Sequence, residues 1–197
     1  MDKTWLANRI KESSISYNKF LELTQQKLSD NEFKENEKYD LTKLNLQRSN
    51  RIYKTYNVSE EIKQLVEKIK QEQTWVVITE DWCGDSAQNL PYIVKIAELN
   101  NKIDLRIILR DQNLDVMDLY LTNGKSRSIP KLVAFDKDWN ELFQWGPRPK
   151  EAQLVVEQSI KEGLDKNTYL EKLHLWYTED KGRSLEKEFI LLIQNTL

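Results

Sequence analysis

One stretch of the sequence, residues 75–86, constrains the fold more than any other. It reads W-V-V-I-T-E-D-W-C-G-D-S, an apolar and β-branched run followed by the only cysteine of the chain, Cys83. Runs of this kind favour a buried strand. The residues that follow, Asp85–Leu99, place apolar side chains at the spacing of an amphipathic helix. The sequence therefore predicts a strand that delivers a single thiol to the first turn of a helix.

The expected position of Cys83 has a consequence for its protonation. The first N–H groups of a helix lack intrahelical partners, and the helix dipole adds partial positive charge there. Three neighbouring carboxylates, Glu80, Asp81 and Asp85, oppose the thiolate. Exposed carboxylates are screened by salt more than a helix end in direct contact. We therefore expect the pKa of Cys83 to lie modestly below its ordinary value of about 8.5.

Composition excludes several classes of protein. The chain has 197 residues, the length of about one domain, and 30 basic against 32 acidic residues give a net charge of −2. This balance predicts binding neither to nucleic acid nor to a membrane surface. A single cysteine cannot form an intrachain disulfide, and the first residues lack the apolar core of a signal peptide, so we expect a cytoplasmic protein. One histidine and one cysteine predict no metal site, and we expect no cofactor.

The rest of the sequence predicts alternating helices and strands after a polar, helix-prone region at residues 1–57. In that region, Asp40 is expected to cap a helix. Apolar runs predict strands at 75–79, 103–109, 129–135 and 139–145, and helices at 60–71, 85–99, 151–163 and within 165–197, the last with a break near Lys181–Gly182. A helix between the first two strands predicts parallel pairing, and the last two strands predict an antiparallel hairpin. The helix at 151–163 is expected to close the fold.

Three short motifs carry a resemblance to a known family. W-C-G-D-S at 82–86, S-I-P-K-L-V-A-F at 128–135 and W-G-P-R-P at 145–149 together resemble thioredoxin-like proteins, in particular a bacterial branch of them. The resemblance implies an α/β thioredoxin fold, in which a central mixed sheet is flanked by helices, with N- and C-terminal helical extensions. It divides one compact unit into an extension at 1–57, a thioredoxin-like domain at 58–163 and an extension at 164–197.

The resemblance also implies roles for individual residues. Cys83 corresponds to the nucleophile of the family, and Ser86, one helical turn later, would assist it. The bond between Ile129 and Pro130 corresponds to a cis peptide bond that faces the nucleophile in the family. Five residues would line the substrate groove: Trp82, Gly84, Asp85, Ile129 and Pro130.

Two departures from the family pattern limit the chemistry. Ser86 stands where dithiol members have a second cysteine, and Val77 stands where they commonly bury an aspartate. A hydroxyl cannot resolve a mixed disulfide, so an external thiol would have to do so. Ser86 either donates a hydrogen bond to the Cys83 thiolate or simply fills the place of the missing cysteine.

Two functional hypotheses follow. In the first, Cys83 exchanges thiols with a protein disulfide or a low-molecular-weight thiol, and an external thiol completes the cycle. In the second, the chain is a non-catalytic binding or redox-sensing module, and a lone cysteine can also be merely a small buried hydrophobe. His174 is interpreted as a structural histidine rather than a base for Cys83. The motif Trp145–Pro149 is interpreted as a structural turn, with no assigned role for Arg148.

Overall fold

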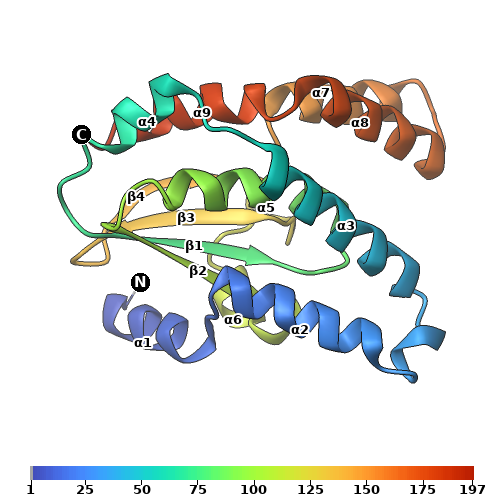
Figure 1. The fold of residues 1–197 in the computed structure, drawn as a ribbon, viewed down its shortest axis with the longest axis horizontal. Coiled ribbons are helices and arrows are strands. Elements are labelled where there is room, and N and C mark those ends of the chain that lie inside the picture. The colour runs from blue at the N-terminus through green and yellow to red at the C-terminus, as the bar shows by residue number, and fades with distance from the viewer. Residues whose placement is uncertain (1) are drawn as a thin grey trace.

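The computed structural model describes residues 2–197 and contains a mixed sheet flanked by helices on both faces, as the sequence predicted (Figure 1). Within those residues the strand order is β2-β1-β3-β4. The strands are β1 (Gln73–Thr79), β2 (Ile103–Leu109), β3 (Lys131–Asp136) and β4 (Glu141–Trp145). The β1 strand pairs in parallel with β2 and antiparallel with β3, and β3 and β4 form the predicted hairpin.

The central strand β1 is buried on both faces, which explains its almost continuous apolar sequence. Trp75 and Val77 face one side of the sheet and belong to the larger core cluster. Val76 and Ile78 alternate with them and belong to the cluster on the opposite face. The strand that leads to the cysteine is therefore fixed from both sides.

Several helices cover the face that carries Trp75. The bounds of these helices are α2 (Tyr17–Ser29), α3 (Tyr39–Thr55), α4 (Glu60–Val66), α5 (Gly84–Ala97) and α9 (Arg183–Gln194). Ser59 caps α4 through its side chain, as predicted, but α3 begins at Tyr39 with Lys38 at its N-cap, so the predicted cap by Asp40 is wrong. Asp40 instead lies in the first helical turn, where its negative charge interacts favourably with the positive end of the helix dipole.

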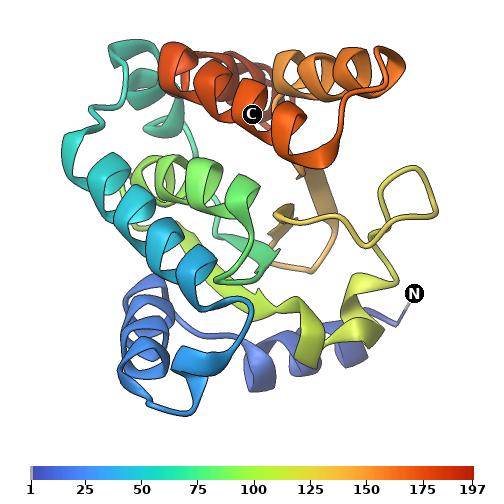
Figure 2. The same cartoon turned by 90° about the vertical axis from the view of Figure 1, so that its right-hand side faces the viewer.

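The opposite face of the sheet is covered by α1 (Lys3–Ser13) and α6 (Leu114–Met117) (Figure 1 and Figure 2). Two short 3₁₀ turns lie in connections, η1 (Phe33–Glu35) between α2 and α3 and η2 (Arg110–Gln112) between β2 and α6. Leu6 and Ile10 of α1 and Val116 and Met117 of α6 are buried in the cluster beneath this face. Ile15, just after α1, forms an isolated antiparallel bridge with β2. The N-terminal extension thus packs directly on the sheet.

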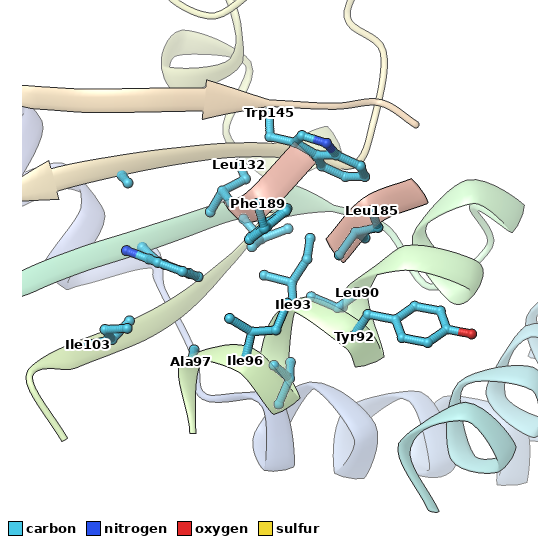
Figure 3. Packing of buried hydrophobic residues seen from close by; sticks show 14 of the residues in the cluster. Leu90, Tyr92, Ile93, Ile96, Ala97, Ile103, Leu132, Trp145, Leu185 and Phe189 are labelled. Atoms are coloured by element: carbon cyan, nitrogen blue, oxygen red, sulfur yellow. The ribbon is translucent and has the colours of Figure 1, made fainter. Parts of the chain in front are cut away.

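The helix predicted to close the fold does not do so. The observed α7 (Lys150–Lys161) packs against α8 (Lys166–Asp180) in a separate small core, and the two helices extend beyond the sheet in Figure 1. Helix α9 closes the sheet instead, because the Phe189 ring packs in tilted or edge-on contacts against Trp75, Phe143 and Trp145, with ring centroids 5.9, 6.4 and 5.7 Å apart. Figure 3 shows Phe189 beside Trp145 in this core. The C-terminal segment is therefore part of the main core.

The connection between α8 and α9 lies at the predicted position. Lys181 and Gly182 adopt positive φ angles of 54° and 84°, which end one helix and redirect the chain. A side chain at residue 182 would lie 2.5 Å from the Tyr92 ring, so glycine is required there for space as well as for conformation. Among residues 2–197, no helix combines the length and hydropathy needed to cross a membrane.

Candidate functional site

Cys83 lies at the N-cap of α5, immediately after the loop that leaves β1. The half-buried thiol donates a hydrogen bond to the carbonyl oxygen of Ile129, with 3.3 Å between Sγ and oxygen. The Ile129–Pro130 peptide bond is cis. The pairing of β1 with β3 explains this meeting, because Ile78 lies opposite Lys131 and the two loops leave the same edge of the sheet.

Ser86 lies one turn into α5 and is almost fully buried. Its hydroxyl oxygen accepts a hydrogen bond from the Thr79 hydroxyl at 2.6 Å, and the Ser86 side chain acts to lower the pKa of Cys83. Val77, where the family commonly has an acid, is enclosed in the apolar core opposite Leu132.

The pKa of Cys83 is raised, so the expected modest lowering is wrong. Burial of the thiol is the largest cause, and the negative charge of Asp85 is the next. Hydrogen bonds from the Ser86 hydroxyl and from the backbone N–H groups of Ser86 and Asp85 act in the opposite direction without offsetting these two. The expectation failed because it treated the thiol as solvent-exposed and gave no weight to desolvation.

Asp85 belongs to a hydrogen-bonded network that sequence reasoning did not find. Its carboxylate accepts from Arg148, with Nε at 3.1 Å and Nη2 also in contact, and from the Tyr177 hydroxyl at 2.7 Å. Asn89 donates to the same hydroxyl at 3.0 Å, and Arg148 also donates to Gln153 at 2.8 Å. The Asp85 and Arg148 side chains are only 11% and 18% exposed. This largely buried ion pair connects the W-G-P-R-P motif to the cysteine turn.

The register of the hairpin contained a signal for Arg148. Leu132 lies opposite Trp145, so the residues just after β4 must lie beside the residues just before β3. Because Ile129 and Pro130 were expected to face the thiol, the predicted hairpin also implied that the W-G-P-R-P motif lies near it, although the motif was interpreted only as a structural turn. Tyr177 carried no comparable signal, because its position depends on how α8 packs on α7.

The other two carboxylates near the cysteine turn are held away from the thiol. Glu80 is buried and accepts from the backbone N–H of Asp111 at 2.7 Å, and its pKa is raised, chiefly by burial. Asp81 accepts from the ammonium of Lys27 at 2.9 Å. Among the three acids considered from the sequence, Asp85 is the one that raises the pKa of the thiol.

Two cations lie against the ring of Trp82, the residue before the cysteine. Lys38 Nζ lies 4.5 Å from the ring centroid and Arg110 Cζ lies 4.9 Å from it. Arg110 also donates to the carbonyl of Arg127 at 3.3 Å, which ties the Trp82 side of the site to the loop at residues 122–128. Cation–π contacts with both side chains therefore hold the indole next to the cysteine turn.

Gly84 contacts the C-terminal extension. A Cβ at this position would lie 3.5 Å from His174 Cε1, which places the imidazole of α8 against the cysteine turn. The Nδ1 atom of His174 is buried and has no hydrogen-bond partner within the described residues, and burial is the main cause of its lowered pKa. A lowered pKa keeps this imidazole neutral near neutral pH, so it adds no positive charge beside the thiol.

A groove of about 810 Å³ lies beside the proline loop. Its lining comes from the loop at residues 122–128, from the turn at residues 146–148 and from one side of α7. Gly146, with a φ of 118°, packs so closely that a Cβ there would lie 2.2 Å from the Pro130 carbonyl oxygen. The described part of the chain holds no group of three or more His, Cys, Asp or Glu side chains arranged to bind a metal ion.

Comparisons with known proteins agree with this fold. The sequence model of a family described as thioredoxin matches residues 30–161. The crystal structure of PA1234, a protein of unknown function from Pseudomonas aeruginosa, superposes with a TM-score of 0.66 at 15% identity, covering 97% of this chain and 98% of that one. An HIV epitope scaffold superposes with a TM-score of 0.57 at 18% identity over 78% and 87% of the two chains.

These two structures are informative about the fold alone, because their identities to this chain are low. No curated protein sequence matches the chain. The PA1234 superposition extends over nearly the whole of both chains, so it includes helices that lie outside the family match. Because the family match itself spans well over half of the sequence, the chain belongs to the thioredoxin family.

Proposed function

We propose that Cys83 performs thiol–disulfide exchange as a single thiol, with an external thiol completing the cycle. The observation that carries this proposal is the position of the thiol, at the N-cap of a 14-residue helix and hydrogen-bonded to the Ile129 carbonyl beside Pro130. The sequence contains no second cysteine that could resolve a mixed disulfide.

The proposed exchange has two balanced steps. The Cys83 thiol loses its proton to solvent, and the thiolate attacks one sulfur of a disulfide, which forms a mixed disulfide and releases the other sulfur as a thiolate that takes up a proton. An external thiol then attacks the mixed disulfide, regenerates the Cys83 thiol and leaves as a new disulfide with the first ligand. A reducing compartment such as the cytoplasm would supply that thiol.

Neighbouring residues have distinct roles in this proposal. The Ser86 hydroxyl donates a hydrogen bond that favours the thiolate, and Asp85 opposes it. The Ile129 carbonyl accepts from the thiol in the resting state and loses that bond when the sulfur attacks. Trp82, Gly84 and Pro130 would line the path of the incoming disulfide, which comes from a protein or from a small molecule.

One observation favours the alternative function, a non-catalytic binding or redox-sensing module. The raised pKa of Cys83 leaves a small thiolate fraction at neutral pH, and the thiolate is the reacting species. In that function the cation-flanked indole of Trp82 and the backbone at Ile129 would hold a partner without exchange.

Mass spectrometry can separate the two functions. The full chain is incubated with hydroxyethyl disulfide, and formation of the mixed disulfide is followed over time, with Cys83→Ser as the blank. Release of the adduct by a small thiol would support the exchange cycle. Partner binding that persists in Cys83→Ser, together with no exchange in the unmodified chain, would support the binding module.

A second variant tests whether the scaffold positions the sulfur for exchange. Ser86→Cys restores a second thiol one turn from Cys83, and we expect it to gain insulin-disulfide reduction. Failure of this variant to form an internal disulfide under oxidation would contradict the placement of the two side chains.

A further inference from the structure

A cavity of about 420 Å³ lies where α3, α5 and the C-terminal end of α8 meet. Its volume is within the range of about 300–1,000 Å³ that is typical of small-molecule sites. The lining comes from the end of α3 and the two residues after it, from two side chains of α5, and from the end of α8 and the residue after it. It includes neither Cys83 nor the proline loop, so the proposed exchange leaves this cavity without a role.

Two buried polar side chains of α5 line this cavity without a partner in the protein. Gln88 and Tyr92 are one helical turn apart, so they lie on the same side of the helix, and they are 5% and 8% exposed. Neither the Gln88 amide nor the Tyr92 hydroxyl makes a hydrogen bond within residues 2–197. Figure 3 shows the Tyr92 hydroxyl pointing away from the apolar side chains of the core. Because buried polar groups are almost always hydrogen-bonded, these two groups indicate a polar partner inside the cavity.

The cavity is lined by two cations and by no carboxylate. Arg51 and Lys181 both border it, and neither forms an ion pair within the described part of the chain. Burial is the main reason that the pKa of Tyr92 is raised to about 12, and Arg51 acts against it. The guanidinium of Arg51 therefore lies close enough to the phenol to affect its charge, and the phenol remains a hydrogen-bond donor at neutral pH.

Two carboxylates near the cavity lie outside its lining and are already bonded to the protein. Asp180 accepts from the Ser184 hydroxyl at 2.6 Å. Glu186 accepts from the backbone N–H of Ser59 at 3.2 Å and from the Tyr56 hydroxyl. The two cations of the lining are therefore left for a ligand.

The charges and donors of the lining indicate a phosphoryl group. A phosphate monoester carries a charge of about −1.5 to −2 at pH 7 and has three strong acceptor oxygens. That charge matches the two cations, and the Gln88 amide and the Tyr92 hydroxyl supply two neutral donors. The planar guanidinium of Arg51 can bind two phosphate oxygens at once, and a lysine ammonium binds phosphate as a point charge. A single carboxylate would leave one of the two cations unpaired.

We propose that this cavity binds a small phosphorylated organic molecule. The phosphoryl group pairs with Arg51 and Lys181, and its oxygens accept hydrogen bonds from Gln88 and Tyr92. The organic part of the molecule lies against the remaining lining, which includes the apolar side chain of Ile52. This inference goes beyond the proposed function, because the residues of the cysteine turn at 82–86 are not part of the lining.

The test is isothermal titration calorimetry of the full chain with three pairs of probes. Ribose 5-phosphate, glycerol 3-phosphate and adenosine monophosphate are each compared with the same molecule without its phosphate. Inorganic phosphate and glutarate are titrated separately. We expect at least one ester to bind about tenfold more tightly than its unphosphorylated counterpart, inorganic phosphate and glutarate, and this difference to shrink at high salt.

Single variants locate the site. Arg51→Gln and Lys181→Gln each remove one cation of the lining and should weaken binding of that ester about tenfold. Lys54→Gln removes the same charge from the same helix outside the lining and should leave the affinity unchanged. Gln88→Leu replaces the unpaired amide with an apolar group of similar size. It should weaken the ester about threefold and leave the free energy of unfolding in urea unchanged or higher, because no hydrogen bond within the protein is lost.

The inference would be overturned if none of the three esters bound more tightly than its unphosphorylated counterpart. Equal affinity for inorganic phosphate would reduce the cavity to a simple anion site, and tighter binding of glutarate would assign it to carboxylates, so either result would also overturn it. An equal loss of affinity in Lys54→Gln and Arg51→Gln would do the same, because the effect would then come from overall charge. Cys83→Ser should bind the ester like the unmodified chain, so a failure of thiol exchange and a failure of this inference are observed separately.

Discussion

Replacement of Arg148 by methionine removes the guanidinium that faces Asp85 and keeps most of the aliphatic stem. The two side chains are 18% and 11% exposed, so Asp85 would be left as a largely buried carboxylate without its counter-ion. Loss of one partner from a buried ion pair costs about 3–5 kcal/mol. The Tyr177 hydroxyl donates to Asp85 at 2.7 Å with or without Arg148, so the carboxylate keeps one hydrogen-bond donor in the variant. We therefore expect a loss near the lower end of that range, about 3 kcal/mol of unfolding free energy.

The same replacement acts on the thiol. Asp85 already raises the pKa of Cys83, and without Arg148 its charge is less compensated, so the pKa of Cys83 should rise further. Each unit of increase lowers the thiolate fraction at neutral pH about tenfold. The assay is the rate of iodoacetamide alkylation of Cys83 from neutral to alkaline pH, measured together with urea unfolding of the same samples.

Two variants complete the test. Arg148→Lys keeps the charge but not the forked geometry, and we expect it to restore the pH midpoint more than the stability. Asp85→Asn removes the opposing charge and should lower the midpoint below that of the unmodified chain. An unchanged midpoint in Arg148→Met, or a stability loss below about 1 kcal/mol, would refute the idea that a buried pair sets the protonation of the thiol.

Three further predictions follow from the fold. Phe189→Ala should lower the free energy of unfolding, measured in urea, by about 3–5 kcal/mol. Leu191 is 62% exposed on the same helix, so Leu191→Ala should change it by no more than about 0.5 kcal/mol. Similar losses in the two variants would contradict the core position of α9. Gly146→Ala should cost at least about 2 kcal/mol, because its Cβ meets the Pro130 carbonyl at 2.2 Å and φ is 118°, and unaltered stability would be evidence against that packing. Burial raises the pKa of Glu80, so the folded state binds that proton more tightly than the unfolded state does. The free energy of unfolding therefore falls as pH rises from 4.5 through the folded-state pKa. Glu80→Gln should remove this fall, and a variant with an unchanged pH profile would refute the prediction.

The sheet could be predicted because its signals are local. The run of β-branched and aliphatic residues at Ile103–Leu109 forms a strand with the predicted bounds, and β1 begins two residues before its prediction. The closing helix could not be assigned, because α7 and α9 both have an apolar face and nothing in the sequence says which surface each face covers. Phe189 reaches Trp75 across more than a hundred residues, and that contact is decided by packing alone.

The features of the site were likewise predictable where they depend on local sequence and not where they depend on packing. The motifs placed Cys83, Ile129 and Pro130, because strand pairing brings both loops to one edge of the sheet. The direction of the thiol pKa could not be predicted, since it depends on desolvation by surrounding elements rather than on the helix end. The hydrogen bond from Tyr177 to Asp85 could not be predicted either, because it depends on how α8 packs against α7.

A raised thiol pKa also bears on how a single-thiol site would behave after its first reaction. In a mixed disulfide, the sulfur with the lower thiol pKa is the better leaving group. With the pKa of Cys83 raised by burial and by Asp85, an external thiol would expel the bound ligand more readily than it would expel Cys83. Attack would then exchange one adduct for another on the same sulfur. Ser86 works against this outcome, because its hydrogen bond stabilises the Cys83 thiolate as it leaves. The balance between Asp85 and Ser86 would therefore set whether the site turns over or retains its adduct, and Arg148, through Asp85, would shift it toward turnover.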